Sequence, residues 1–311
     1  MARNGLPRHR FALVRMPVPK LNPSQFDEYL FGTWKPTVSG FYERFHIERI
    51  ENYKAHLKLP VLPHRRSVYF FIFVTKGLAV RSKGLTRYEV GPGMLFCLAA
   101  DQITSLEAIS DDVEGFYCHF RPELFHHAHL PVNLEQEFPF FSLTADQPLI
   151  CVPQSDRLCA LLDILLAERL RNDPARIRLV ALYLTALLTE LNHLNQSLPA
   201  TSPTAAAALT QRYKRLLSER IYEKNTVSEL AAILGISANH LNKCVKSTTG
   251  KSAHELLEDI RILEAKVLLK QTRLPVADIA FKIGGFDPSD FARFFKTKTG
   301  LSPKSYRNLP E

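Results

Sequence analysis

Between residues 40 and 120, apolar and polar positions alternate in short runs that are separated by turn signals. The most apolar run is 68–74, and turns such as Gly91-Pro92-Gly93 interrupt the region. A period of two residues is typical of strands with one buried face, and several short strands at this spacing favour a sandwich or barrel. We therefore expect a small β-barrel in the first half of the chain.

The apolar period lengthens to that of a helix after residue 153. Leucines recur at helical spacing up to Arg171, and a second helical pattern runs from about Ala175 to Asn195. Asp173 followed by Pro174 provides a cap and a proline at the first helical position. The pattern predicts a helical hairpin, and the Ser- and Pro-rich segment after it predicts a linker at 197–207.

The last hundred residues contain a near-duplication. The first copy of the pattern consists of Val227, Leu230, Ala231 and Leu234, and the second of Val276, Ile279, Ala280 and Ile283. A glycine turn follows each copy, and then a second apolar helix face, formed by Leu241, Cys244 and Val245 or by Phe291, Phe294 and Phe295. Two short helices joined by a tight turn form a helix-turn-helix unit, which inserts its second helix into the major groove of DNA. The pattern predicts two such units.

Charge supports a polyanionic partner. The chain carries a formal net charge of +9, and residues 206–311 contain 18 Lys and Arg against 11 Asp and Glu. A basic segment that also contains two predicted helix-turn-helix units is typical of a double-stranded DNA-binding domain.

Three stretches resemble the DNA-binding domain of AraC/XylS-type bacterial transcription regulators: 227–237, 261–268 and 279–303, with the text IAFKIGGFDPSDFARFFKTKTGLSP in the last. One departure is Gly284-Gly285-Phe286, because similar sequences usually place an aromatic residue directly after a single glycine. The resemblance implies an α+β multidomain protein with a cupin-like β-barrel, a helical hairpin and an all-α domain with two helix-turn-helix units. Its expected parts are a sensor at 1–150, a dimerisation hairpin at 151–196 and a reader at 208–308.

The outward positions of the two second helices are the candidate DNA contacts. Asn pairs well with adenine and Lys reaches guanine, so Asn239, Asn242 and Lys243 are the expected base contacts, with Lys246 beside them. On the other helix the candidates are Ser289, Arg293 and Lys296, whereas Asp290 disfavours a close phosphate. A solvated helix face is the competing interpretation.

The resemblance also implies partners: promoter DNA, RNA polymerase, a second copy of the chain and a small-molecule effector in the barrel. The candidate effector residues are His64, Arg65, Arg66 and Tyr69, on or beside the most apolar strand. We expect the Tyr69, Phe71 and Phe73 side chains to point into the barrel, although core packing explains aromatic residues there equally well. A basic residue at the barrel mouth would favour an acidic ligand.

A metal-dependent cupin enzyme is the main rival, and its metal site needs two close histidines, a glutamate and a later histidine. Residues 63–67 and 94–100 do not supply that set, and His126, His127 and His129 lack nearby ligands at a recognisable spacing. No nucleophile–base arrangement or phosphate-binding glycine loop is found either. We expect no catalytic activity, metal or cofactor.

The scattered cysteines and the absence of a long apolar run or secretory leader favour a cytoplasmic protein. Two alternatives stay open at this stage. One is a small-molecule-binding cupin, with or without a metal, whose helical domain mediates assembly. The other is a regulator without an effector, whose barrel only dimerises.

Overall fold

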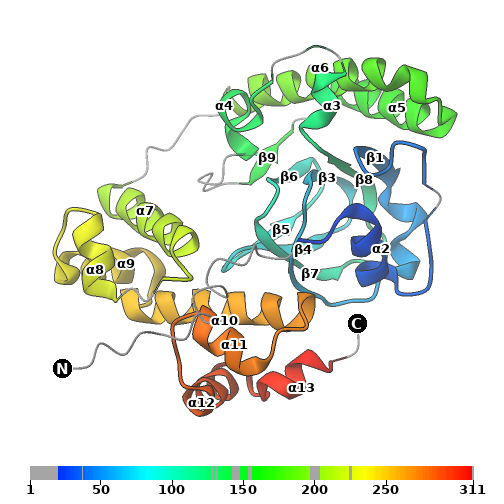
Figure 1. The fold of residues 1–311 in the computed structure, drawn as a ribbon. Coiled ribbons are helices and arrows are strands. Elements are labelled where there is room, and N and C mark those ends of the chain that lie inside the picture. The colour runs from blue at the N-terminus through cyan, green and yellow to red at the C-terminus, as the bar shows by residue number, and fades with distance from the viewer. Residues whose placement is uncertain are drawn as a thin grey trace, which may run out of the picture. The chain divides into compact units, whose positions relative to one another are not determined.

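The computed structural model describes two compact units, one within residues 20–200 and the other within 201–310 (Figure 1). The described residues are 20–36, 38–127, 129, 132–141, 148–152, 156–196, 204–223 and 226–309. Within these ranges no helix is long and apolar enough to cross a membrane.

The first unit is built on two antiparallel sheets. Its strands are β1 (Phe45–Arg49), β2 (Val61–Arg65), β3 (Tyr69–Lys76), β4 (Ala79–Lys83), β5 (Thr86–Val90), β6 (Met94–Leu98), β7 (Ile103–Ile109), β8 (Glu114–Phe120) and β9 (Leu149–Cys151). The five-stranded sheet has the order β1-β8-β3-β6-β9, and the four-stranded sheet has the order β2-β7-β4-β5. The expected strand-rich region between residues 40 and 120 is confirmed.

Helices cover both sheets. They are α2 (Pro23–Phe31), α3 (Glu123–His126), α4 (Leu134–Glu137), α5 (Asp156–Arg171) and α6 (Ile177–Gln196), with short 3₁₀ turns η1 (Ile50–Asn52), η2 (Lys54–His56), η3 (Pro139–Phe141) and η4 (Pro174–Arg176). The α2 helix was not expected from the sequence. It begins with a capping box, in which the Asn22 side chain accepts from the Gln25 N–H and the Gln25 side chain accepts from the Asn22 N–H.

The hairpin of α5 and α6 packs on the barrel. One hydrophobic cluster joins Phe71 and Phe116 of the five-stranded sheet to Leu162 of α5 and Leu184 of α6. Asp173 caps the turn between the helices by accepting from the Ala175 N–H, as expected. Because the core continues across residue 150, the hairpin and the barrel form one packed unit.

The two faces of β3 are reversed relative to the sequence expectation. Phe71 and Phe73 pack in the cluster with α5 and α6, while Phe70, Ile72 and Val74 belong to the cluster on the other face of the sheet. Side chains of a strand alternate between faces, so an error of one residue reverses the whole set. Tyr69, Phe71 and Phe73 therefore do not point into the barrel.

The second unit is all-helical. Its helices are α7 (Ala205–Glu219), α8 (Val227–Ile233), α9 (Ala238–Thr249), α10 (Ala253–Gln271), α11 (Val276–Lys282), α12 (Pro288–Thr299) and α13 (Pro303–Arg307). In Figure 1, α8 and α9 lie beside one end of α10, and α11 to α13 lie below it. The α10 helix contacts members of both pairs. The expected linker at 197–207 lies outside the described residues up to 203, and α7 already begins at Ala205.

The two helix-turn-helix turns differ by one glycine. Gly235 in the first and Gly285 in the second have positive φ, +74° and +67°, a conformation that favours glycine. The Ile236 N–H donates to Ala231 O, whereas the Phe286 N–H donates one residue further back, to Ala280 O. The added residue lies in the turn before the left-handed glycine. The Phe286 ring still stacks on Phe294 at 5.3 Å, so the aromatic contact with α12 is kept.

Candidate DNA-reading helices and barrel cavity

The α9 helix has one buried and one polar face. Ser237 caps its start by accepting from the His240 N–H. Leu241 and Val245 are fully buried against α7, α8 and α10, and the capping box of Thr226 and Glu229 fixes the start of α8 behind them. The polar face is therefore held outward by packing, as a reading helix requires.

Most of the predicted contacts on α9 lie on this polar face. Asn239, Lys243 and Lys246 are exposed. His240 is exposed too, one position after Asn239 in the first turn of α9, and the sequence analysis missed it. The signal was available, because the first turn of a reading helix is the part that meets base edges.

Asn242 has a structural contact instead. Its side chain is half-buried, and its Oδ1 accepts from the Ala253 N–H at 3.0 Å. This hydrogen bond joins α9 to the first residue of α10. Of the three expected base contacts, Asn242 is the one whose acceptor is already used within the unit.

The α12 helix repeats the arrangement. Phe291 and Phe295 are buried, and Ser289, Arg293 and Lys296 are exposed. Arg293 Nη2 lies 2.7 Å from Asp290 Oδ1, with both side chains largely in solvent. The nearby carboxylate reduces the positive charge that Arg293 offers to a phosphate.

The remaining cations of the two faces are available. Among the residues described, Lys243, Lys246 and Lys296 take part in no ion pair, whereas Lys251 pairs with Asp259 and Lys298 with Glu258. Unpaired exposed lysines next to reading positions are suited to phosphate contacts.

The α10 helix sets the distance between the two pairs. Its 19 residues correspond to about 28 Å at the standard helical rise. Beside it, a polar cluster joins α10 and α11 to the turn that follows α7. Glu264 of α10 accepts from the hydroxyl of Tyr222 in that turn, and Lys282 Nζ of α11 lies 4.3 Å from the Tyr222 ring centroid. Burial lowers the pKa of Lys282, while the Glu264 charge raises it. The two halves of the unit are therefore fixed by more than apolar packing.

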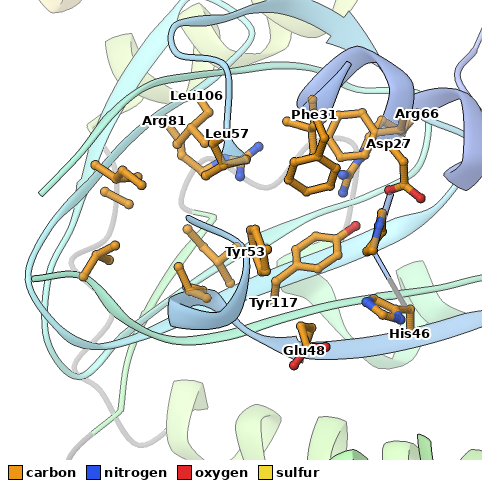
Figure 2. A pocket seen from close by; sticks show the side chains of 18 of the residues that line it. Asp27, Phe31, His46, Glu48, Tyr53, Leu57, Arg66, Arg81, Leu106 and Tyr117 are labelled. Carbon is orange, nitrogen blue, oxygen red and sulfur yellow. The ribbon is translucent and has the colours of Figure 1, made fainter. Parts of the chain in front are cut away.

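The barrel of the first unit contains a cavity of about 60 Å³ (Figure 2). A water needs roughly 10–15 Å³ on this measure, so the cavity has room for several waters or for part of a small organic molecule. It lies between α2, the 3₁₀ turns and both sheets. Its walls are mostly apolar, and the residues lining it include Phe26, Leu30, Phe31, Ile50, Tyr53, Leu57, Ile72, Leu106, Ile109 and Tyr117.

Only one of the predicted effector residues lines this cavity. Arg66 does so, whereas His64 is fully buried beneath the Phe26 and Tyr29 rings. Arg65 Nε donates to Asp101 O, and Tyr69 packs on Phe120 on the opposite face of β3. Arg81 of β4 is the lining residue that the sequence analysis missed. In the sequence its place is inconspicuous, because one arginine in a short polar strand normally faces solvent.

Two acidic groups of the cavity already have partners. Both carboxylate oxygens of Asp27 accept from the Tyr42 hydroxyl, at 2.5 and 2.6 Å. Burial nevertheless raises the pKa of Asp27 to about 6. Glu48 Oε2 lies 2.5 Å from Arg169 Nη2, which ties this wall of the cavity to α5.

Buried histidines surround the cavity without forming a metal site. Burial lowers the pKa of His64 and of His119 to about 3, and it lowers that of His46 well below the usual range. Within the described part of the chain, no three His, Cys, Asp or Glu side chains gather as metal ligands. In the 126–129 region, Ala128 is outside the described residues, and His127 Nε2 lies 2.8 Å from Arg44 Nη1.

Two family profiles match the chain. The profile described as an AraC-like ligand binding domain matches residues 49–188, and the one described as a helix-turn-helix domain matches residues 230–309. The first covers the barrel and most of the hairpin. The second covers both helix-turn-helix pairs.

The chain is also similar to individual proteins. The chain is 24% identical over 255 residues to the HTH-type transcriptional activator RhaR of Escherichia coli O6:H1, covering 79% of this chain and 86% of RhaR. It is 30% identical over 107 residues to YisR, an uncharacterized HTH-type transcriptional regulator of Bacillus subtilis, and this match spans 37% of YisR. A structure of ToxT from Vibrio cholerae aligns over 85% of this chain and 97% of ToxT, with 16% identity and a TM-score of 0.41. The chain is a DNA-binding regulator with a ligand-binding domain, and it belongs to the AraC-type family of transcription regulators.

Proposed function

We propose that the protein recognises a specific promoter sequence by placing α9 and α12 in successive major grooves. The observation that carries this proposal is the pair of exposed polar helix faces, each held outward by its buried partner residues and joined through α10. A length of about 28 Å for α10 is of the order of one turn of DNA, roughly 34 Å.

Individual side chains have different roles in this proposal. Asn239, Lys243 and Arg293 contact bases, and His240 lies close enough along α9 to share this task. Lys246 and Lys296 contact phosphates, together with the Ser289 hydroxyl at the start of α12. Asn242 positions α9 against α10 through its hydrogen bond to Ala253.

The hairpin is the proposed dimerisation surface. Ile164 of α5 and Leu182 of α6 are 38% and 40% exposed, although both helices pack their other faces on the barrel. Exposed aliphatic side chains on two adjacent helices suit association with a second copy. A dimer would present four reading helices to one promoter.

We also propose that a small molecule bound in the first unit controls DNA binding by the second. An effector in the barrel cavity changes the arrangement of the two copies, provided that it binds one arrangement more tightly than the other. The protein then acts in the cytoplasm as a non-catalytic activator that contacts RNA polymerase.

The DNA-reading proposal is tested with matched variants. Fluorescence anisotropy compares the duplex upstream of the protein's own gene with a scrambled duplex. The double variant Lys243→Ala with Lys246→Ala should lose at least tenfold affinity, because two phosphate- or base-directed charges are removed. Arg87→Ala, which removes an exposed charge from β5, is the control and should bind as the wild type does. An equal loss of affinity in the double variant and in the Arg87→Ala control would contradict the assignment of Lys243 and Lys246 as DNA contacts.

Dimerisation and activation need separate measurements. Sedimentation velocity should show that Leu182→Glu converts a dimer into a monomer, whereas an unchanged dimer would place the interface elsewhere. A transcriptional reporter fused to the upstream region should fall in activity when the gene is deleted. A rise in reporter activity would identify a repressor.

A further inference from the structure

We propose that the effector of this protein is an organic anion with one carboxylate and a small apolar body, and that Arg66 and Arg81 bind the carboxylate inside the barrel. The inference rests on the proposed function, because it takes the barrel cavity to be the effector site. It goes further by naming the chemical class of the ligand and the residues that select it.

The first observation is that two buried arginines carry N–H groups without a hydrogen-bond acceptor. Arg66 is 3% exposed and Arg81 is 6% exposed. Both guanidinium groups lie over aromatic rings, and Arg66 also interacts with the Tyr117 side chain. Among the described residues, however, Arg66 Nε and Nη2 and Arg81 Nε are buried without any hydrogen-bond partner, and the structure shows no ion pair for either arginine. Buried charges in proteins are normally paired, so two unpaired guanidinium groups in one cavity need an explanation.

The second observation is that both arginines line the same cavity and lie next to the same aromatic ring. The Arg66 Cζ atom lies 3.9 Å from the Phe70 ring centroid, and the Arg81 Cζ atom lies 4.9 Å from the same centroid. Both arginines line the cavity, and in Figure 2 both guanidinium groups lie beside its open space. Guanidinium groups bind carboxylates through paired N–H donors, so this arrangement suits a carboxylate between them.

The charge of the cavity favours the same ligand. Burial and the neighbouring positive charge of Arg66 lower the pKa of Arg81 to about 9. The acidic groups nearby compensate only in part. Asp27 carries one negative charge that interacts with Arg66, because a pKa of about 6 leaves it mostly ionised at pH 7.5, and the charge of Glu48 is paired with Arg169. Two arginines against one such carboxylate leave the cavity with a net positive charge. A bound anion would supply the missing negative charge, whereas a cation would add to the repulsion.

The rest of the lining selects an apolar body. Beyond the arginines, the cavity is bounded by side chains such as Phe31, Ile72 and Leu106. A sugar would leave its hydroxyl groups unpaired against these walls, at a cost of about 1–3 kcal/mol for each buried unpaired group. The volume of about 60 Å³ limits the ligand to a small acid.

The test measures ligand binding to the protein at pH 7.5 in two ways. Thermal unfolding gives the shift in unfolding temperature, and isothermal titration calorimetry gives the affinity. The probes are propanoate and butanoate, each compared with its neutral amide, propanamide or butanamide, because acids of this size suit a cavity of about 60 Å³. We expect at least one acid to raise the unfolding temperature and to bind at least tenfold more tightly than its amide. Equal binding of acid and amide, or no binding of either acid, would overturn the inference.

Substitutions of Arg81 test whether the acids bind inside the cavity. Arg81→Met should weaken acid binding at least tenfold without lowering the unfolding temperature of the ligand-free protein, because the arginine forms no ion pair among the described residues and methionine can replace its packing on the Phe70 and Phe96 rings. Arg81→Lys should recover part of the affinity, and Arg87→Met on the neighbouring strand β5 should bind acid as the wild type does. If Arg81→Met destabilises the ligand-free protein and leaves acid binding intact, Arg81 has a structural role and the inference fails.

The same protein preparations are also tested for binding to the upstream duplex. Specific DNA binding without any response to the acids would reject the ligand class and leave the proposed function standing. If the wild-type protein does not bind the upstream duplex specifically, the proposed function itself is rejected, whether or not the acids bind.

Discussion

The two units of this protein differ in one group of buried charges each. In the second unit, Lys282 of α11 and Glu264 of α10 are buried around the Tyr222 side chain, and the charged groups of the reading helices α9 and α12 face outward. In the first unit, Arg66 and Arg81 are buried around a cavity, and the described residues form no ion pair with either of them.

The difference indicates what each unit is built to bind. A buried charge with a partner stabilises a fixed arrangement, whereas a buried charge without one is costly until a ligand compensates it. The second unit offers its free charges on a surface, where a long polyanion such as DNA can reach them. The first unit holds its free charges inside, where only a small molecule can.

The largest expected effect is on the free energy of unfolding, when the opposing charge of the buried Lys282 in the second unit is removed. Glu264→Ala leaves Lys282 buried without its opposing charge, so the free energy of unfolding should fall by about 3–5 kcal/mol. Urea unfolding followed by circular dichroism measures it. The control Glu258→Ala, on the same helix and in a more exposed pair with Lys298, should cost less than about 1 kcal/mol. Similar losses in both variants would remove the contrast between the units.

A second pair of variants separates base contacts from phosphate contacts on the reading helices. Asn239→Ala should cost about 1–3 kcal/mol on the cognate duplex and little on a scrambled one, because only a base contact distinguishes sequences. Lys296→Ala should weaken binding to both duplexes by a similar factor. Anisotropy with both duplexes measures the two effects, and an equal loss on both for Asn239→Ala would refute its reading role.

The pH dependence of stability should differ between the units. Burial lowers the folded-state pKa of His64 and of His119 to about 3, so the unfolded chain binds more protons as the pH falls from about 6.5. Each group should therefore cost the first unit about 1.4 kcal/mol per pH unit over most of the range between 6.5 and 3. Asp27, with its pKa raised to about 6, opposes part of this, because its contribution to stability is lost as the pH rises through that value.

The single tryptophan makes this measurement specific. Trp34 lies in the first unit, so its fluorescence during urea unfolding reports on that unit alone. His64→Gln should reduce the slope of stability against pH. An unchanged slope would show that His64 does not titrate as its burial requires.

The smallest expected effect concerns Asn242. Asn242→Ala removes the acceptor for the Ala253 N–H and should lower the stability of the second unit by about 1 kcal/mol. Calorimetry of the variant measures this change. A variant as stable as the wild type that nevertheless loses base preference would restore Asn242 to the reading face.

The second unit could be predicted from the sequence almost residue by residue. Each helix there is short, amphipathic and locally capped, so Leu241 and Phe291 signal the buried face and their neighbours the exposed one. Two exceptions are His240, whose exposed position was missed, and Asn242, whose partner lies beyond the end of its own helix. Such a contact depends on where α10 begins relative to α9, which periodicity does not reveal.

The first unit could be predicted only in outline. Short strands and turns were evident, but the direction in which Tyr69 and Phe71 point depends on pairing with β6 and β8, which local pattern does not fix. Arg81 was missed for the same reason, whereas the α2 helix was missed although its capping box of Asn22 and Gln25 is a local signal. Both contribute to a cavity assembled from residues far apart in the chain.

The central claim is that the second unit binds DNA by charge and selects it by sequence. Its most direct test is fluorescence anisotropy of the wild-type protein with its upstream duplex and a scrambled duplex across a series of KCl concentrations. We predict tighter binding to the upstream duplex at every concentration, with the logarithm of affinity falling linearly with the logarithm of salt for both. Equal affinity for the two duplexes, or affinity that does not change with salt, would contradict the account.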